Sequence, residues 1–271
     1  MKCWIDVRLR GDEGWYSVDF GSTPEDLPEG EVVIAGLRGN CSIDDAKMID
    51  MFHSTGMLQY VETLEIRGSW ENPNEGLTLF SRLESLRELD IELDLDRNGL
   101  NVIDSGVRCL ERLSRLERLT LCFEGTGDGA ISSIQKLPLL TNLGLSFTKV
   151  TDKGVQELAG LAQLQVLDLC GSAITDSGLT HLRTKGGLQK LPLLTNLDLS
   201  FTKVTDKGVQ ELAVLARLQV LDLSRTAITD SGLAHLKAIR GLQKLDLHNT
   251  EITENGIKDL KNALPDCVIH K

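Results

Sequence analysis

Aromatic residues and positive charges are both scarce in this chain of 271 residues. Phe, Trp and Tyr together make up 4% of it, so any core must be filled mainly by aliphatic side chains. The 29 Lys and Arg residues stand against 40 Asp and Glu residues, which gives a formal net charge of −11. Proteins that bind nucleic acid need clustered basic residues to neutralise phosphates, so no nucleic-acid partner is expected.

Long apolar runs and paired cysteines are also missing. The first residues, MKCWIDVRLRGDEGW, lack the run of about 7 to 15 apolar residues of a signal peptide, and no run approaches the roughly 20 residues of a membrane span. The six cysteines include no CxxC pair and the five histidines are dispersed, so neither a zinc site nor a catalytic triad is indicated. We therefore expect a cytoplasmic protein with reduced thiols, no membrane contact and no enzymatic activity.

Leucine is abundant, and it recurs with a period. Paired aliphatic residues of an LxxLxL pattern return mostly every 24 or 25 residues, with two steps of 30. The pairs are Leu64/Ile66, Leu89/Ile91, Leu119/Leu121, Leu143/Leu145, Leu167/Leu169, Leu197/Leu199, Leu221/Leu223 and Leu245/Leu247. A degenerate first copy lies in VVIAGLRGN (32–40), and a last one in LPDCVIHK (264–271), where Cys267 and Ile269 take the aliphatic places. A period of this length indicates stacked repeats.

Each repeat predicts a strand followed by a short helix. In LQVLDLSRT (218–226), Leu221 and Leu223 share one face of the strand and Asp222 lies on the other. A Thr or Ser follows, where its hydroxyl can bond the turning backbone, and then a Thr-Asp pair typical of a helix N-terminus. DSGLAHLKAI (230–239) has apolar residues at helical spacing. Since no such unit can bury its apolar face alone, the units must stack.

This LxxLxLxxTxITDxGL pattern resembles the leucine-rich repeat proteins over roughly residues 32 to 271, with Ser or Thr in place of the usual Asn. Its ITDxGL continuation is similar to the bacterial and cysteine-containing branches of that family. The resemblance implies an α/β solenoid: a curved right-handed ribbon with parallel strands on the concave face, short helices on the convex face and no inherent enzymatic activity. Such a resemblance says much more about fold than about function.

Two further patterns define the predicted organisation. Residues 134–187 and 188–241 align without a gap and are identical at about 42 of 54 positions, so a block of two repeats was duplicated in tandem. CWIDVRLRGDEGWYSVDFGS (3–22) alternates apolar and polar residues on both sides of GDEG, which predicts a β-hairpin. We expect residues 1–31 to form an N-terminal cap and residues 32–271 a solenoid of about 9 to 10 units.

One insertion carries residues with metal-ligand spacing. DLDRNG (94–99) matches the first half of a calcium loop, with Asp94, Asp96 and Asn98 as oxygen ligands and a glycine at the turn. The twelfth loop position is Ser105 in place of the bidentate Glu, and an ordinary polar loop also explains the stretch. We otherwise expect no cofactor.

The residues between the paired aliphatics give the strongest functional signal. In successive repeats they are Glu65, Asp90, Thr120, Gly144, Asp168, Asp198, Asp222 and Asp246. Because neighbouring strands lie about 4.8 Å apart, the last four predict a ladder of carboxylates that repel one another and suit a basic partner. The alternative is that LDLS is simply a common form of this repeat, doubled by the duplication.

Aromatic residues flank this ladder at the strand exits. Phe123, Phe147 and Phe201 each follow the second aliphatic by two residues, where either an interface anchor or a ring partly buried under the loops is expected. We therefore predict a monomeric, non-enzymatic scaffold that binds a protein with a basic or mixed face on its concave surface. The predicted contacts are Asp168, Asp198, Asp222, Asp246, Asn142, Asn196, Phe147, Phe201, Lys244 and His248. The alternatives are a calcium-binding module using the 94–99 loop and an adaptor or effector-like substrate receptor.

Overall fold

The computed structural model describes residues 4–9, 16–19, 32–38, 61–68, 73–93, 104–158, 160–184 and 191–271. They belong to two compact units, the first spanning residues 1–126 and 136–140 and the second residues 127–135 and 141–271. This division into two units differs from the predicted cap (residues 1–31) and solenoid (residues 32–271). The boundary between cap and solenoid stays a prediction.

The first unit combines an antiparallel pair of strands with a parallel sheet. Strand β1 (Trp4–Leu9) pairs antiparallel with β2 (Tyr16–Asp19), as predicted for the hairpin, and also with β3 (Val32–Arg38). Parallel strands β4 (Thr63–Gly68), β5 (Glu88–Leu93) and β6 (Arg118–Cys122) follow β3 in chain order. Strand β1 therefore covers the edge that β3 would otherwise leave open to pairing with another chain.

Short helices accompany the strands of this unit. They are α2 (Pro73–Phe80), α3 (Asp104–Arg108) and the 3-10 helix η3 (Cys109–Arg112). Leu77 and Phe80 of α2 and Leu110 of η3 are buried with the paired aliphatics of β4 and β5. The predicted calcium loop, Asp94, Asp96 and Asn98, lies outside the described residues.

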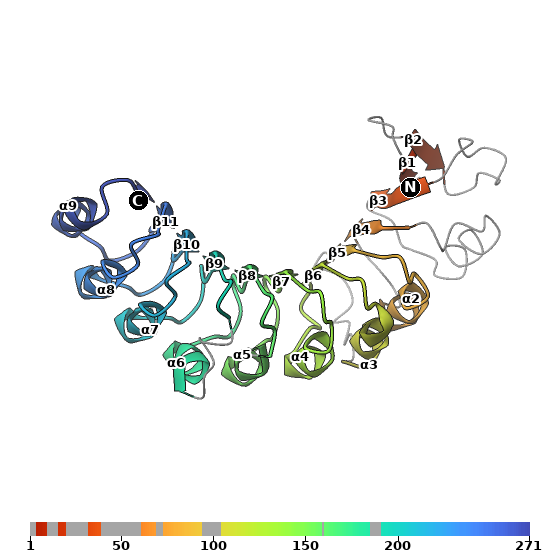
Figure 1. Cartoon of the computed structure of the whole chain (residues 1–271), viewed down its shortest axis with the longest axis horizontal. Coiled ribbons are helices and arrows are strands. Elements are labelled where there is room, and N and C mark those ends of the chain that lie inside the picture. The colour runs from red at the N-terminus through yellow and green to blue at the C-terminus, as the bar shows by residue number, and fades with distance from the viewer. Residues whose placement is uncertain are drawn as a thin grey trace. The chain divides into compact units, whose positions relative to one another are not determined.

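The second unit repeats one strand and one helix per coil. Its parallel strands are β7 (Asn142–Gly144), β8 (Val166–Asp168), β9 (Asn196–Asp198), β10 (Val220–Asp222), β11 (Lys244–Asp246) and β12 (Val268–His270). Its helices are α4 (Asp128–Ile134), α5 (Asp152–Leu158), α6 (Asp176–Thr184), α7 (Asp206–Leu212), α8 (Asp230–Leu236) and α9 (Glu254–Ala263). Within this unit the strands line the inner side of the curve and the helices its outer side (Figure 1).

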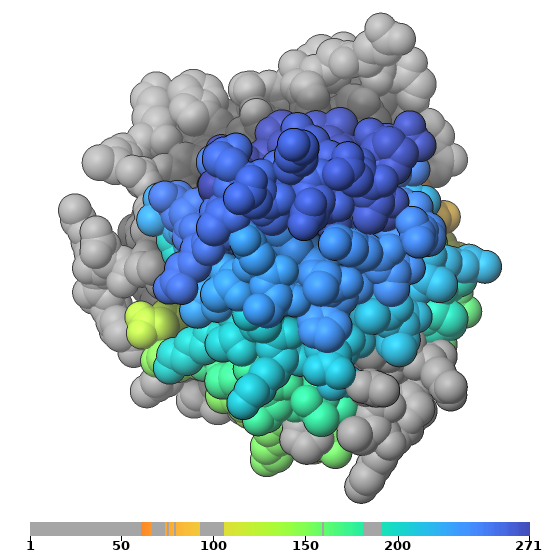
Figure 2. Space-filling view, turned by 90° about the vertical axis from the view of Figure 1, so that its left-hand side faces the viewer, coloured from red at the N-terminus to blue at the C-terminus, as the bar shows by residue number. Residues whose placement is uncertain are grey.

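The paired leucines form the core between these two layers. Leu221 and Leu223 are 0% exposed, whereas Asp222 between them is half-buried on the opposite face of the strand. Each buried leucine contributes about 1.5 to 3 kcal/mol, but only once the next coil covers it, so the coils are stable as a stack. Figure 2 looks at this stack from the C-terminal end of the unit, where successive coils lie as layers.

The register of the strands confirms the predicted alignment except in the last repeat. Leu167 lies opposite Leu197, and Leu197 opposite Leu221. In the last pair Ile269 lies opposite Leu245, so the prediction that Cys267 takes this place was wrong by two residues. The final coil keeps the 24-residue step from Leu245 to Ile269, even though its LxxCxI sequence falls two residues early. Cys267, one residue before β12 begins, is nevertheless buried.

None of the helices in the described part of the chain is long and apolar enough to cross a membrane.

Candidate functional site

The predicted carboxylate ladder forms on the strand face of the second unit. Asp198 of β9 lies opposite Asp168 of β8 on one side and Asp222 of β10 on the other. Asp222 lies in turn opposite Asp246 of β11. All four are half-buried and alternate with buried leucines, so their carboxylates form one row, which we call the carboxylate column.

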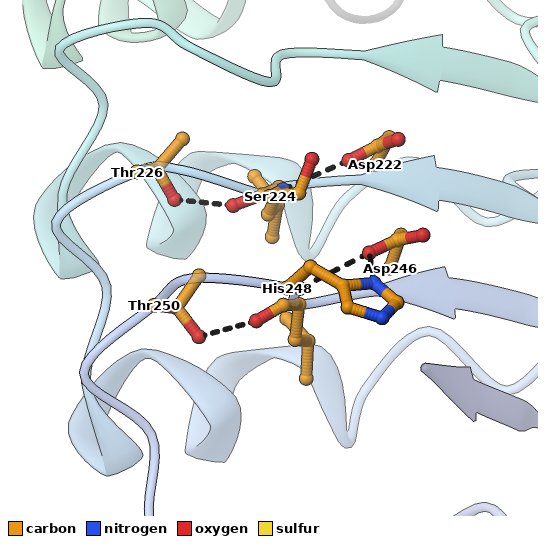
Figure 3. Close-up of polar contacts among 8 residues, drawn as sticks. Asp222, Ser224, Thr226, Asp246, His248 and Thr250 are labelled. Atoms are coloured by element: carbon orange, nitrogen blue, oxygen red, sulfur yellow. Dashed lines mark hydrogen bonds and ion pairs between the residues drawn. The ribbon is translucent and has the colours of Figure 1, made fainter. Parts of the chain in front are cut away.

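Each carboxylate of the column also accepts a hydrogen bond from the backbone two residues further on. The N–H donors are those of Cys170, Ser200, Ser224 and His248, at 2.9, 2.8, 2.8 and 3.0 Å from the Oδ1 atoms of Asp168, Asp198, Asp222 and Asp246. Figure 3 shows the last two of these bonds, at the exits of β10 and β11. The sequence suggested an array of charges that only repel one another. Because each Asp also satisfies a backbone donor where its strand ends, the column has a stabilising role as well.

The pKa values of two carboxylates in the column shift in opposite directions. Burial raises the pKa of Asp198, and so do the carboxylates of Asp168 and Asp222, although hydrogen bonds from Ser200 act against this. Burial also tends to raise the pKa of Asp246, but hydrogen bonds from His248 and the charges of His248 and His270 bring its pKa below the usual value. The column therefore has two histidines beside Asp246 at its C-terminal end, whereas the charged groups that shift the pKa of Asp198 are other carboxylates.

The predicted hydroxyls after the strands bond the turning backbone. Thr226 Oγ1 donates to the Leu223 carbonyl at 2.6 Å and Thr250 Oγ1 to the Leu247 carbonyl at 2.7 Å (Figure 3). Thr148, Ser172 and Thr202 do the same in the preceding coils. This confirms the predicted role of the hydroxyl and fixes how the chain leaves each strand.

The residue just before each of these hydroxyls has a left-handed backbone. Phe147, Gly171, Phe201, Arg225 and Asn249 have φ of 55, 65, 56, 55 and 56° in five successive coils. The turn directs their side chains away from the core, and Phe147 and Phe201 are 50% and 48% exposed. We call Phe147, Phe201 and Arg225, with Gly171 in the coil between those of the two phenylalanines, the aromatic ridge.

The side chains of the aromatic ridge contact one another across the coils. The rings of Phe147 and Phe201 meet edge to face, with centroids 6.0 Å apart. Arg225 Cζ lies 4.8 Å from the centroid of Phe201, within cation–π range. Phe123, in the first unit, is only 4% exposed, so for this ring the alternative of burial is the one that the structure shows. Its φ is not positive, and its ring therefore does not follow the same outward turn.

The other predicted contact residues surround these two rows. Asn142 and Asn196 are half-buried at the starts of β7 and β9, and Val166 of β8 lies between them. Lys244 is exposed at the start of β11. His248 is exposed, with Nδ1 2.6 Å from Asp246 Oδ1, and its ring stacks on His270 with centroids 6.3 Å apart.

A second set of aspartates, which the sequence suggested were only helix caps, joins successive coils. Asp206 Oδ1 accepts from the Thr229 N–H at 2.8 Å, and Oδ2 accepts from the Thr229 hydroxyl at 2.6 Å. The same pair of bonds joins Asp128 to Thr151, Asp152 to Thr175, Asp176 to Thr205 and Asp230 to Thr253. Thr229 itself caps α8 by accepting from the Ser231 N–H, as predicted. We call these contacts the Asp–Thr staples.

The staples also explain the glycine that follows each Thr-Asp pair. A Cβ on Gly208 would lie 2.5 Å from Asp176 Oδ1 and 3.0 Å from Val204 Cγ1. The D-x-G spacing at the repeat period was the available signal for this contact. These carboxylates are therefore part of the scaffold.

The described residues offer little for other chemistry. They include no group of three or more His, Cys, Asp or Glu side chains placed to hold a metal ion. Cys109, Cys122, Cys170 and Cys267 form no disulfide, and burial is the largest cause that raises the pKa of Cys170 and Cys267. The carboxylate column and the aromatic ridge are the features that remain.

Comparison with known proteins agrees with this architecture. Residues 136–159, 190–213 and 217–236 match the family model described as Leucine Rich repeat. The fold is similar to internalin C2 from Listeria monocytogenes, with 22% identity, a TM-score of 0.51 and 84% of each chain covered. An LRR protein from Leptospira interrogans has 18% identity and a TM-score of 0.46, with 80% of this chain and 68% of that one covered. No curated protein sequence matches.

Together with the repeated coil, the three matched segments show that the chain contains leucine-rich repeats. The fold is that of an α/β solenoid, a class in which stacked repeats present an extended surface for contact with other proteins.

Proposed function

We propose that the strand face of the second unit is a protein-binding surface, and that its partner presents a basic or mixed face. A rigid stack of coils loses little conformational freedom on binding, which favours this use of the fold. The protein acts in this proposal as a non-enzymatic scaffold.

The observation that carries the proposal is the run of Asp168, Asp198 and Asp222 beside two exposed phenylalanines. None of the three carboxylates forms an ion pair with any described residue, and their closest charged neighbours in the column are other carboxylates. Adding a cation would relieve their mutual repulsion, which amounts to about 1 kcal/mol per pair in water and more at a partly dry interface.

The aromatic side chains support the same surface. Left-handed backbone costs a residue other than glycine about 1 to 3 kcal/mol, and a half-exposed phenylalanine recovers only part of its burial energy. Glycine would fill both positions without this strain, as Gly171 does in the coil between them. Folding thus does not favour Phe147 and Phe201, whereas interface cores are rich in such residues.

Affinity capture from a lysate of the source organism tests the proposal. The test variant combines Asp168→Asn, Asp198→Asn and Asp222→Asn, because an asparagine Oδ1 still accepts the backbone N–H while the charge is removed. A control variant with the same charge change combines Glu254→Gln, Asp259→Asn and Asp266→Asn, three exposed residues of the last coil. A partner retained by the wild type and the control, and lost by the test variant, supports the proposal. Equal retention by all three proteins contradicts it.

A further inference from the structure

The aromatic ridge has the chemistry of a binding site for a cationic side chain. We propose that Phe147 and Phe201 bind an arginine side chain from an extended segment of the partner, and that Asp168 and Asp198 accept hydrogen bonds from its guanidinium. This rests on the proposed function, and it specifies the partner's chemistry at that surface.

The chain itself shows how a guanidinium lies on this ridge. Arg225 stacks on Phe201 at 4.8 Å, and its place in the duplicated block corresponds to Gly171, fifty-four residues earlier. Glycine leaves that coil without a side chain, and the Phe147 ring lies over it and extends toward Phe201. The coil of Gly171 therefore supplies no cation of its own, and the guanidinium from the partner would lie against the exposed surface of the Phe147 and Phe201 rings.

The carboxylates available to this guanidinium come from the same coils. The coil of Gly171 carries Asp168, and the coil of Phe201 carries Asp198, with the two aspartates directly opposite each other in β8 and β9. Ser146 donates to Asp168 Oδ2 at 2.5 Å, the Ser200 side chain hydrogen-bonds Asp198, and a backbone N–H donates to Oδ1 of each. A carboxylate has about four lone-pair sites, so acceptor capacity remains on both. By contrast, Asp246 already has His248 beside it.

Arginine fits this arrangement better than lysine. Its planar guanidinium can stack on an aromatic face and bond carboxylates in its own plane at the same time. A lysine ammonium is a compact, strongly hydrated charge that gains less from the rings. The planar shape of the guanidinium therefore adds to the attraction of its charge, and the ridge should bind arginine more tightly than lysine.

Fluorescence anisotropy with synthetic peptides tests this inference directly. The probes are fluorescein-labelled decapeptides of alternating glycine with arginine, with lysine or with citrulline, which has the shape of arginine without its charge. They are titrated with the full chain at physiological ionic strength, because exposed charges attract any polycation at low salt. The wild type should bind the arginine peptide at least about tenfold more tightly than the citrulline peptide, and more tightly than the lysine peptide.

Two variants separate the rings from the charges. Phe147→Gly with Phe201→Gly removes both rings and keeps a backbone that glycine adopts without strain. Val214→Gly is its control, because Val214 is 51% exposed and the other copy of the block has Gly160 at this place. The double variant should lose about tenfold in affinity for the arginine peptide and lose the preference for arginine over lysine, while Val214→Gly should change neither.

The remaining outcomes overturn the inference in distinguishable ways. If the Phe variant binds like the wild type but the triple Asp→Asn variant does not, the ridge inference fails and the carboxylate surface stands. If the wild type binds the arginine peptide no more tightly than the lysine and citrulline peptides, the inference fails whatever the lysate capture shows. If the triple Asp→Asn variant also captures the partner from lysate as well as the wild type does, the proposed function fails together with the inference.

Discussion

Phe147 lies over Gly171 so closely that a Cβ on this glycine would be 2.5 Å from Phe147 Cδ1. The missing side chain allows the Phe147 ring to extend across one coil and meet Phe201, two coils further on. In the duplicated block the equivalent of Gly171 is Arg225, which stacks on Phe201. The aromatic ridge therefore depends as much on the glycine as on the two rings.

The first prediction concerns this glycine. Gly171→Ala should displace the Phe147 ring and lower the free energy of unfolding by about 1 to 2 kcal/mol, because a Cβ meets the ring and φ is +65°. Thermal unfolding gives the loss of stability, and nuclear Overhauser contacts between the two rings report their separation. Gly241→Ala is the control, since its Cβ would meet only ordinary contacts at 3.5 Å. Unchanged ring contacts in Gly171→Ala would contradict the described packing.

The second prediction concerns the charge on Asp198, whose raised pKa has a definite sign for stability. An acid with a higher pKa in the folded state than in the unfolded state loses stability as the pH rises between the two values. Asp198→Asn should therefore stabilise the protein at pH 7 by about 1 kcal/mol or less, because it removes repulsion by Asp168 and Asp222 and keeps the acceptor for the Ser200 N–H.

Chemical denaturation at several pH values measures this effect. The advantage of Asp198→Asn should disappear below about pH 4, where the wild-type carboxyl is protonated in both states. A destabilisation at pH 7 would mean that the charged form is favoured in the fold. Asp259→Asn, at an exposed position of α9, should change little at either pH.

The third prediction concerns the staple between Asp206 and Thr229. Asp206→Ala leaves the Thr229 N–H and hydroxyl without their acceptor and should lower the free energy of unfolding by about 2 kcal/mol. Lys207→Ala, next to it and exposed, is the control and should cost no more than about 0.5 kcal/mol. Urea denaturation measures both; equal small losses would show that the staple contributes nothing.

The fourth prediction concerns His248 and the lowered pKa of Asp246. His248→Ala removes the ring hydrogen bond and its charge but keeps the backbone N–H, so the pKa of Asp246 should rise. The favourable interaction is present above the unfolded pKa of Asp246 and is lost as the pH falls through its folded pKa, so the stability lost in the variant should shrink in acid, where Asp246 is protonated in both states. Carboxyl carbon NMR titration measures Asp246, with Asp198 as the internal control; an unmoved Asp246 pKa would contradict this role of His248.

The sequence predicted the scaffold far better than the surface. The leucine period predicts which residues are buried, and the hydroxyl of Thr226 bonds the backbone as expected, because both depend on local pattern. Contacts between coils are less visible: Asp206 looks like a simple cap until Thr229 of the next coil is beside it. The last repeat shows the same limit. Its LPDC stretch matches the LxxL pattern, but the residue opposite Leu245 is Ile269, two residues after the cysteine.

The exposure of the phenylalanines was even less predictable. Phe123 and Phe147 have the same spacing from their leucines, yet one is 4% exposed and the other 50%. The difference follows from the left-handed backbone at Phe147, which the residue type alone does not predict. The duplication accounts for the occurrence of Phe at both 147 and 201, but not for the glycine and arginine that shape the ridge around them.

The most direct test of the central claim is site-specific photo-crosslinking of the full chain in lysate. Benzoylphenylalanine is incorporated in place of Phe147 or Phe201 of the aromatic ridge, or in place of Val214, which has a similar exposure and lies just after the end of α7. If the strand face binds the partner, a discrete adduct forms at positions 147 and 201 and not at 214, and it disappears when Asp168, Asp198 and Asp222 are changed to asparagine. An adduct at 214 alone, or one at 147 and 201 that survives the loss of the three charges, would contradict the claim.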